Sequence, residues 1–542
     1  MTGKALARLS AAAVVVLATV FPPTGAVATT PGTAPPGTAP PCTAGTEVRT
    51  AEGPVCGLAR DGVTSWLGIR YAAAPVGELR WRAPRPVEHW RDTFSATAPG
   101  NQCPQPARLG PARTVEDCLN LDVRVPRDAG PGPLPVMVQI HGGGFLLFGP
   151  QNGTHLAATG RVVSVEINYR LGIMGFFADR ALGAHSGNYA LQDQQAALRW
   201  VRRNIARFGG DPGNVTIYGA SAGGSSVCAQ LVSPAARGLF HKGISQSGQY
   251  NSLFGHETSW QAQDCKAQWP TETEAQRAGA RFTAAVGCAD AADVAGCLRA
   301  VPVEKLLAQA GDGLKADSGT IAPVVDGVTI PRAPVDAFED GEVNPARVMI
   351  GVDRDEVQLQ LAETPQQYRE LVRQQYGELA PAVFDRYPLD RFPEPAAFLA
   401  YRTIVADSNS VCPALRTARQ LSRHLPVYAY QVDNTDSPPV WFLDPAKPNG
   451  AFHVAENSFL FPAPDAKFDP NQAVYGRQLV TQWTGFARTG DPTVPGAPRW
   501  SAYTARDPRV MSLQPAGDSV LTREIGEQHQ CGFWNDVAPA PR

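Results

Sequence analysis

The 542-residue sequence has little of three features that would point to particular partners. Its formal net charge is only −2, so neither nucleic acid nor an anionic membrane surface is an expected partner. No stretch after the first 28 residues reaches about 18 consecutive apolar residues, so no membrane anchor is expected. The ten cysteines form no CxxC pair and no Cys/His cluster, so we expect no bound metal. The sequence also contains no internal repeats, and no linker other than the one near its N-terminus that is described below.

The first residues are typical of an export signal that is later removed. Lys4 and Arg8 precede an apolar region of about a dozen residues, and Ala26-Val27-Ala28 is a small-residue cleavage site. Residues 29–41 are rich in Pro, Gly and Thr, which predicts a flexible linker. We therefore expect residues 1–28 to be a signal peptide, and residues 42–542 to form a single domain of a secreted protein.

Export makes the even number of cysteines informative, because exported proteins commonly form disulfides. The short spacings make Cys103–Cys118 and Cys288–Cys297 plausible local loops. Ten cysteines allow too many pairings for the rest to be assigned from their number alone.

The segment around Ser221 has the pattern of a nucleophile elbow. The apolar, β-branched run Val215–Tyr218 predicts a buried strand, the chain turns at Gly219, and residues 226–231 can continue as a helix. Gly-x-Ser-x-Gly between a strand and a helix places a serine hydroxyl above the edge of a sheet. The start of the helix adds amide donors that suit a developing oxyanion. A chance match is the alternative in a chain with 52 glycines.

A second glycine-rich segment follows another predicted strand. Residues 134–140 are apolar, and His141-Gly142-Gly143-Gly144-Phe145 comes directly after them. Three glycines leave the backbone bare, so its amides can point at a ligand. A flexible turn is the alternative, but the preceding strand favours an oxyanion-hole loop.

Strands and helices alternate along the chain. Further strands are predicted at 162–168, 243–248, 348–353 and 426–432, and helices at 187–208, 271–286, 303–310 and 474–488. Alternation of this kind predicts an α/β fold with a mostly parallel central sheet. Residues from about 259 to 401 are richer in helix-forming sequence, which predicts helical insertions.

At this point several stretches together resemble the type-B carboxylesterases of the α/β-hydrolase superfamily. They run in family order from about residue 45 to 536: GIRY at 68–71, EDCLNL at 116–121, HGGGF at 141–145, NYRLGIMGFF at 168–177, the long block at 187–224, GVDRDE at 351–356 and CGFWN at 531–535. The resemblance implies an α/β-hydrolase fold and a bacterial, secreted serine esterase that needs no cofactor.

The resemblance also implies the site residues. Ser221 would be the nucleophile, His453 the general base and Glu356 the acid that orients it. The oxyanion-binding amides would be those of Gly143, Gly144 and Ala222.

The resemblance assigns further pairs to structure rather than catalysis. It implies internal salt bridges Arg80–Glu116 and Arg170–Asp193, and the disulfides Cys103–Cys118, Cys288–Cys297 and Cys412–Cys531. Cys42–Cys56 is inferred from their closeness within a predicted N-terminal hairpin. The states of Cys228 and Cys265 are left open, with a buried thiol as one reading of Cys228.

Departures from the family pattern bear on the substrate. Ala220 stands where many members carry glutamate, and Val357 where many carry glycine. The Cys103–Cys118 loop is short and has no tryptophan for a cation–π contact, so a choline ester is not expected. A carboxylesterase is therefore expected, and residues 358–360 are candidates for an acyl pocket.

Two rival functions stay open at this stage. The first is a lipase for longer-chain acylglycerols, whose site the insertions near 360–400 could cover. The second is a non-catalytic binding protein on the same fold. Neither the acyl and alcohol groups of the substrate nor the oligomeric state follows from the sequence.

Overall fold

The computed structural model describes residues 40–107, 112–248, 269–311, 322–356, 362–438, 440 and 443–537. The described residues belong to one compact unit that begins at Pro40. The predicted signal peptide, nearly all of the predicted linker and the candidate acyl-pocket residues 358–360 lie outside the described residues, so these assignments stay predictions.

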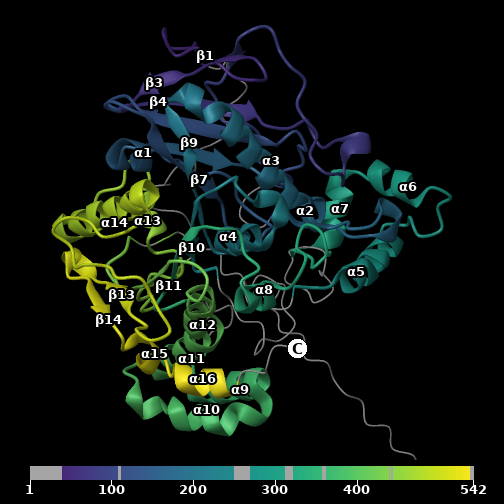
Figure 1. Cartoon of the computed structure of the whole chain (residues 1–542). Coiled ribbons are helices and arrows are strands. Elements are labelled where there is room, and N and C mark those ends of the chain that lie inside the picture. The colour runs from purple at the N-terminus through teal and green to yellow at the C-terminus, as the bar shows by residue number, and fades with distance from the viewer. Residues whose placement is uncertain are drawn as a thin grey trace, which may run out of the picture. The chain divides into compact units, whose positions relative to one another are not determined.

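An eleven-stranded sheet organises the fold (Figure 1). Its order is β14-β13-β12-β11-β10-β9-β7-β8-β6-β4-β3. The seven strands from β8 to β13 in this order are mutually parallel, and antiparallel strands lie at both edges. The strands are β3 Leu58–Arg60, β4 Val63–Arg70, β6 Asn120–Pro126, β7 Leu134–Ile140, β8 Val163–Ile167, β9 Gly210–Ala220, β10 Lys242–Gln246, β11 Arg347–Asp353, β12 Val427–Val432, β13 Val510–Leu513 and β14 Val520–Thr522. The predicted α/β class is confirmed.

A smaller three-stranded sheet joins the N-terminal region. It has the order β1-β2-β5, with β1 Val48–Arg49, β2 Pro54–Cys56 and β5 Phe94–Ser95. Strand β1 contains only two residues, because the polar segment around it has little apolar surface to bury.

The central strands are buried on both faces, and their alternate residues enter two separate cores. In β11, Val348 and Ile350 pack in one core, while Met349, between them, packs in the other. All residues of β7, β8, β10 and β12 are buried. Parallel sheets covered on both faces produce such continuous apolar runs, because neither face meets water.

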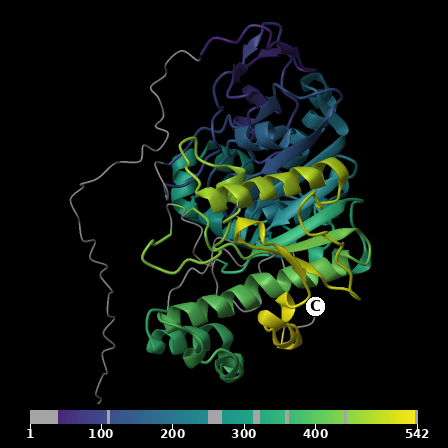
Figure 2. The same cartoon turned by 90° about the vertical axis from the view of Figure 1, so that its left-hand side faces the viewer.

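Helices cover both faces of the sheet (Figures 1 and 2). One core contains side chains of α3 Tyr189–Asn204, α4 Ala222–Val232, α8 Pro334–Asp340 and α12 Cys412–Leu421. The other contains side chains of α1 Thr154–Gly160, α13 Asn457–Leu460 and α14 Pro470–Thr489. Figure 2 shows α14 as the long yellow-green helix in front of the strands.

The remaining helices form two smaller clusters. One contains α2 Gly172–Phe176, α5 Glu272–Ala285, α6 Val294–Ala300 and α7 Val303–Ala310. The other contains α9 Pro365–Tyr376, α10 Ala380–Arg386, α11 Ala396–Ala406 and α16 Cys531–Val537, with the short α15 Ile525–Gln528 before α16. Thr271 and Thr364 begin α5 and α9 with capping boxes.

Two boundaries near Gly209 differ from the sequence prediction. The helix predicted over 187–208 ends at Asn204 and tightens into a 3₁₀ turn at Ile205–Phe208. Strand β9 then begins at Gly210 rather than at Val215, where the predicted strand begins, because Gly210 pairs with Leu134 ahead of a bulge. Strand pairing across the sheet overrides the local turn signal here.

Four disulfides connect described residues: Cys42–Cys56, Cys103–Cys118, Cys288–Cys297 and Cys412–Cys531. Cys228 is also disulfide-bonded, with a partner outside the described residues. The free-thiol reading of Cys228 is therefore wrong.

The two expected internal salt bridges are present. Arg80 binds Glu116 through two hydrogen bonds of 2.8 and 2.5 Å, and Arg170 binds Asp193 through two of 2.7 Å. Both arginines are almost fully buried, which fits a structural role.

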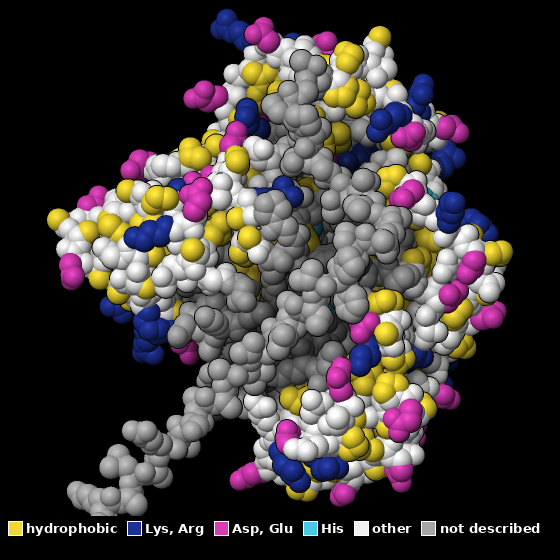
Figure 3. All heavy atoms as spheres, turned by 180° about the vertical axis from the view of Figure 1, so that it is seen from behind, with side chains coloured by type: hydrophobic (Ala, Val, Ile, Leu, Met, Phe, Trp, Pro, Cys, Tyr) yellow, Lys and Arg dark blue, Asp and Glu magenta, His cyan; other side chains and the backbone are white. Residues whose placement is uncertain are grey.

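Among the described residues on the face that Figure 3 shows, acidic and basic side chains are interspersed. None of the helices in the described part of the chain is long and apolar enough to cross a membrane.

Candidate active site

Ser221 lies at the turn between β9 and α4, in a backbone conformation that is rare for a non-glycine residue. Its φ and ψ are 58° and −126°, and its amide donates a 2.9 Å hydrogen bond to the carbonyl of Gln246 at the end of β10. Such strain persists only where surrounding structure imposes it, and it marks functional sites.

The glycines on either side of Ser221 are required by the closeness of the neighbouring strand. A Cβ added to Gly219 or Gly223 would lie 2.2 or 2.1 Å from the carbonyl oxygen of Ile140, at the end of β7. No other residue type fits at these two positions. The Gly-x-Ser-x-Gly pattern therefore reflects close packing of the elbow on β7.

The glycine loop after β7 lies against the same serine. A Cβ on Gly142 would be 3.2 Å from the Cβ of Ser221, and Gly143 and Gly144 have positive φ values of 105° and 63°. The His141 ring stacks on Tyr169, whose hydroxyl donates a 2.7 Å hydrogen bond to the His141 carbonyl. These contacts fix the start of the loop beside the elbow.

His453 and Glu356 form a direct contact. The Nδ1 atom of His453 lies 2.6 Å from Oε2 of Glu356, and the carboxylate is fully buried. The other carboxylate oxygen, Oε1, accepts a 3.2 Å hydrogen bond from the amide of Asp353. Burial lowers the pKa of His453 to about 3, so the imidazole is neutral near pH 7 and can accept a proton.

The sheet topology brings Ser221 and the His453–Glu356 pair to the same end of the parallel strands. Strands β9, β10 and β11 are adjacent and parallel, so their carboxyl ends meet there. Ser221 follows β9 directly and Glu356 follows β11 by three residues. His453 comes from the segment between β12 and α13, far along the chain.

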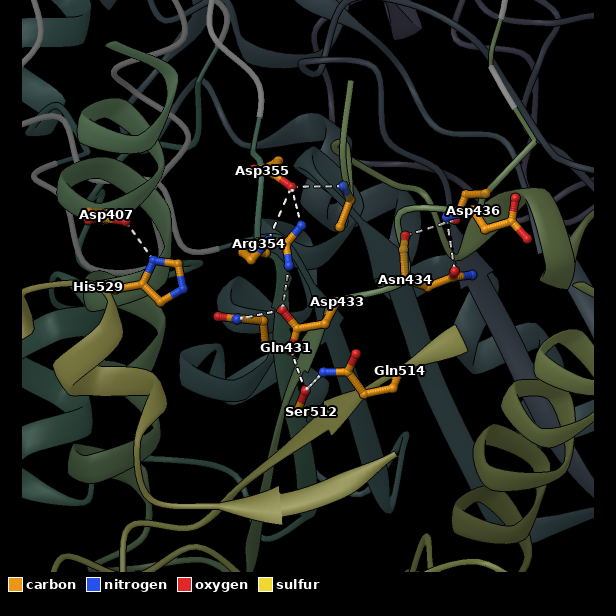
Figure 4. A network of polar contacts seen from close by, with 12 residues as sticks. Arg354, Asp355, Asp407, Gln431, Asp433, Asn434, Asp436, Ser512, Gln514 and His529 are labelled. Atoms are coloured by element: carbon orange, nitrogen blue, oxygen red, sulfur yellow. Dashed lines mark hydrogen bonds and ion pairs between the residues drawn. The ribbon is translucent and has the colours of Figure 1, made fainter. Parts of the chain in front are cut away.

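The segment carrying His453 is fastened to the end of β11 by Asp355. The amide of Asp355 donates a 2.9 Å bond to the carbonyl of Ala451, and Ala451 returns a 2.8 Å bond to its carboxylate. Arg402 binds Asp355 at 2.8 Å and also donates to the carbonyl of Pro448. Figure 4 shows Arg354 lying between Asp355 and Asp433, which it binds at 3.0 and 3.6 Å.

Residues 44–534 match the model of the carboxylesterase family. The chain belongs to this family. It is therefore a carboxylic-ester hydrolase of the serine esterase type.

Individual relatives cover nearly the whole carboxylesterase. The para-nitrobenzyl esterase of Bacillus subtilis (strain 168) is 35% identical over 509 residues, which is 88% of this chain and 96% of the relative. The cocaine esterase of Homo sapiens is 31% identical over 521 residues, 89% of this chain and 88% of the relative. A solved PNB esterase structure superposes with a TM-score of 0.73 at 32% identity, covering 90% of this chain and 99% of that one.

Asp353, Glu356 and His453 of this carboxylesterase form the single group of possible metal ligands among the described residues, with ligand atoms within 4.8 Å of one another. Their hydrogen bonds explain the grouping without an ion. Glu356 holds His453, and Asp353 accepts hydrogen bonds from the amide of Val454 and the hydroxyl of Ser247, at 2.8 and 3.1 Å. We assign no metal to it.

Two buried acids that were not predicted from the sequence, Asp353 and Glu456, lie beside the predicted triad. Asp353 ends β11 and Glu456 immediately precedes α13. The run of carboxylates after the predicted strand at 348–353 was a signal for the first acid. Nothing in the local pattern marks the second, because its partners are distant in sequence.

Proposed function

We propose that Ser221 is the nucleophile of this carboxylesterase, with His453 as general base and Glu356 as the acid that orients it. The observation that supports these roles best is the 2.6 Å contact between His453 and Glu356 at the sheet edge that also bears the strained serine. Glu356 fixes the imidazole tautomer, with the proton on Nδ1 and the lone pair on Nε2 available for the serine proton.

The reaction follows from these roles. His453 takes the proton of Ser221 as its oxygen attacks the ester carbonyl, and the charged imidazolium is stabilised by Glu356. His453 then protonates the leaving alcohol. Water, activated by the same histidine, hydrolyses the acyl-enzyme and regenerates the serine.

The tetrahedral oxyanion would bind to the amides of Gly143, Gly144 and Ala222. The positive φ values of the two glycines turn the loop beside Ser221, and Ala222 is the first residue of α4, where helix amides lack intrahelical acceptors. Losing one such donor costs about 3–4 kcal/mol of transition-state stabilisation in comparable enzymes.

The substrates we propose are compact carboxylic esters. Two relatives are named as esterases of para-nitrobenzyl esters and of cocaine. The disulfide loop Cys103–Cys118 spans only 15 residues, which leaves little chain for a lid of the kind a lipase uses at a lipid surface.

We also propose that the mature enzyme is a bacterial protein that acts outside the cytoplasm. The N-terminal signal pattern is one support, and the second is the set of disulfides, which persist in oxidising compartments. Expression of the full-length chain, followed by N-terminal sequencing of the protein in the medium, tests this. Cleavage after Ala28 is expected, and an intact cytoplasmic chain would contradict it.

The test of the catalytic roles is hydrolysis of p-nitrophenyl esters from acetate to palmitate. Wild type should turn over the short esters fastest, and Ser221→Ala should lose that activity. Ser226→Ala is the matched control, because its hydroxyl donates to the Ala222 carbonyl within the same helix. Retained activity in Ser221→Ala would refute the proposed nucleophile, and a rate that rises sharply once a long-chain ester passes its solubility limit would favour a lipase.

A further inference from the structure

Two buried carboxyl groups, those of Asp353 and Glu456, lie behind the candidate triad. They are 0% and 1% exposed, and neighbouring residues at the end of β10 hold them, because Gln246 donates a hydrogen bond to Glu456 and Ser247 donates one to Asp353. Ionised carboxylates have only acceptor oxygens, so two of them cannot form a hydrogen bond unless one carries a proton. One oxygen on each, Oδ1 of Asp353 and Oε2 of Glu456, has no hydrogen-bond partner in the structure.

The surroundings of the pair offer no compensating cation. Within the described residues, neither acid forms a salt bridge with a lysine or arginine. The facing titratable groups are Glu356 beside Asp353, His453 beyond Glu356, and Tyr430 and Tyr475 beside Glu456. Like charges in a site that excludes water favour retention of a proton.

We propose that Asp353 and Glu456 share one proton and act as a positioning pair for the triad. This inference deepens the proposed function and rests on it. The pair itself touches no reacting atom; it acts through the backbone next to each of the three residues.

The contacts of the pair reach all parts of the site. Asp353 accepts from the amide of Val454, next to His453, and its own amide donates to Glu356. Glu456 accepts a 2.8 Å hydrogen bond from the side chain of Gln246, whose carbonyl receives the amide of Ser221. A single hydrogen bond between the two acids thus joins the ends of β10 and β11 to the histidine segment.

The titration behaviour of the two acids agrees with this geometry. Burial, together with the charges of Glu456 and Glu356, raises the pKa of Asp353 well above its usual value. Burial also raises the pKa of Glu456. Each direction favours the protonated form that the hydrogen bond needs.

Three variants test the pair. Asp353→Asn keeps the geometry, because its amide can donate to Glu456 while its oxygen accepts from Val454. Glu456→Gln keeps it in the same way from the other side. Asp353→Leu has a similar volume but removes every hydrogen bond, so it should displace His453 and lower kcat about 100-fold with a small change in KM. The two amide variants should stay near the wild-type kcat.

The direct readout is infrared spectroscopy of the protein at neutral pH, which detects the C=O stretch of a protonated carboxyl independently of activity. Wild type should show this band, shifted by deuterium exchange, and both amide variants should lack one such band. The same band in Ser221→Ala separates this proposal from the catalytic one. Equal spectra in wild type and both amide variants, or an Asp353→Asn enzyme as slow as Asp353→Leu, would overturn the proposal.

Discussion

The segment 353–356 carries two kinds of carboxyl group that differ in what surrounds them. Asp355 is bound by Arg354, as Figure 4 shows, and also by Arg402, and it fastens the histidine segment to the end of β11. Asp353, two residues earlier, faces Glu456 with no cation among its described contacts. The same residue type is therefore paired with arginines on one side of the strand end and, in our proposal, with a second acid on the other.

Glu356 lies beside Asp353, and its Oε2 atom contacts Nδ1 of His453 at 2.6 Å. Replacing it by Gln should lower kcat about 10⁴-fold, because the amide favours the wrong imidazole tautomer and cannot stabilise the imidazolium. Steady-state hydrolysis of p-nitrophenyl acetate measures the loss. Urea unfolding should show a stable protein; a variant that retains more than a tenth of wild-type kcat would remove Glu356 from the mechanism.

Asp355 forms ion pairs with Arg354 and Arg402, so its loss should affect the stability of the fold more directly than the catalytic step. Asp355→Ala leaves Arg402, which is 9% exposed, without its carboxylate, and should lower the free energy of unfolding by about 3 kcal/mol. Chemical denaturation followed by tryptophan fluorescence measures this. If the loss is below that of an exposed pair such as Lys447–Glu363, the arginine contacts do not hold the segment.

The proposed proton between Asp353 and Glu456 also predicts a pH dependence of stability. Because the pKa values of Asp353 and Glu456 are raised in the folded state, the native protein binds more protons than the unfolded chain above the ordinary carboxyl range. The stabilisation that comes from the proton held by Asp353 and Glu456 is complete at low pH and declines as pH rises. Asp353→Asn removes one proton, so its stability should fall less steeply, by about 1.4 kcal/mol per pH unit. Parallel curves for the two proteins would contradict the assignment.

An exposed acid with arginine partners gives the smallest effect. Asp507 binds Arg509 and Arg523 at 3.0 and 2.8 Å, and these arginines lower its pKa through hydrogen bonds to the charged form, although desolvation opposes them. Water screens such contacts, so Asp507→Asn should leave the melting temperature almost unchanged in differential scanning calorimetry. A loss comparable with that of Asp355→Ala would show that cation contact, rather than burial, sets the stability.

Much of the architecture could be predicted from the chain because the local and the tertiary signals agree. The strand predicted at 134–140 and the helix predicted at 303–310 have those bounds in the structure, since each has a clear apolar pattern and sharp ends. The prediction was wrong at Gly210, where pairing with Leu134 extends β9 into a glycine-rich turn.

The site could be predicted in part for the same reason. Ser221 has a local pattern, but His453 and Glu356 were assigned from the resemblance, and their contact joins segments far apart in sequence. No local sequence pattern indicates the proposed hydrogen bond between Asp353 and Glu456. It depends on how β11 and the segment before α13 meet, and only the folded chain contains that information.

The disulfide between Cys412 and Cys531 has a consequence for the order in which the enzyme is made. Its two cysteines are separated by 119 positions in the sequence, and the loop between them includes His453, β12 and β13, whereas Ser221 and Glu356 precede it. A ribosome therefore completes the proposed nucleophile early and the proposed base late, and the bond that encloses the base cannot form before residue 531 has been synthesised. Every nascent chain shorter than this lacks the covalent link around the histidine segment.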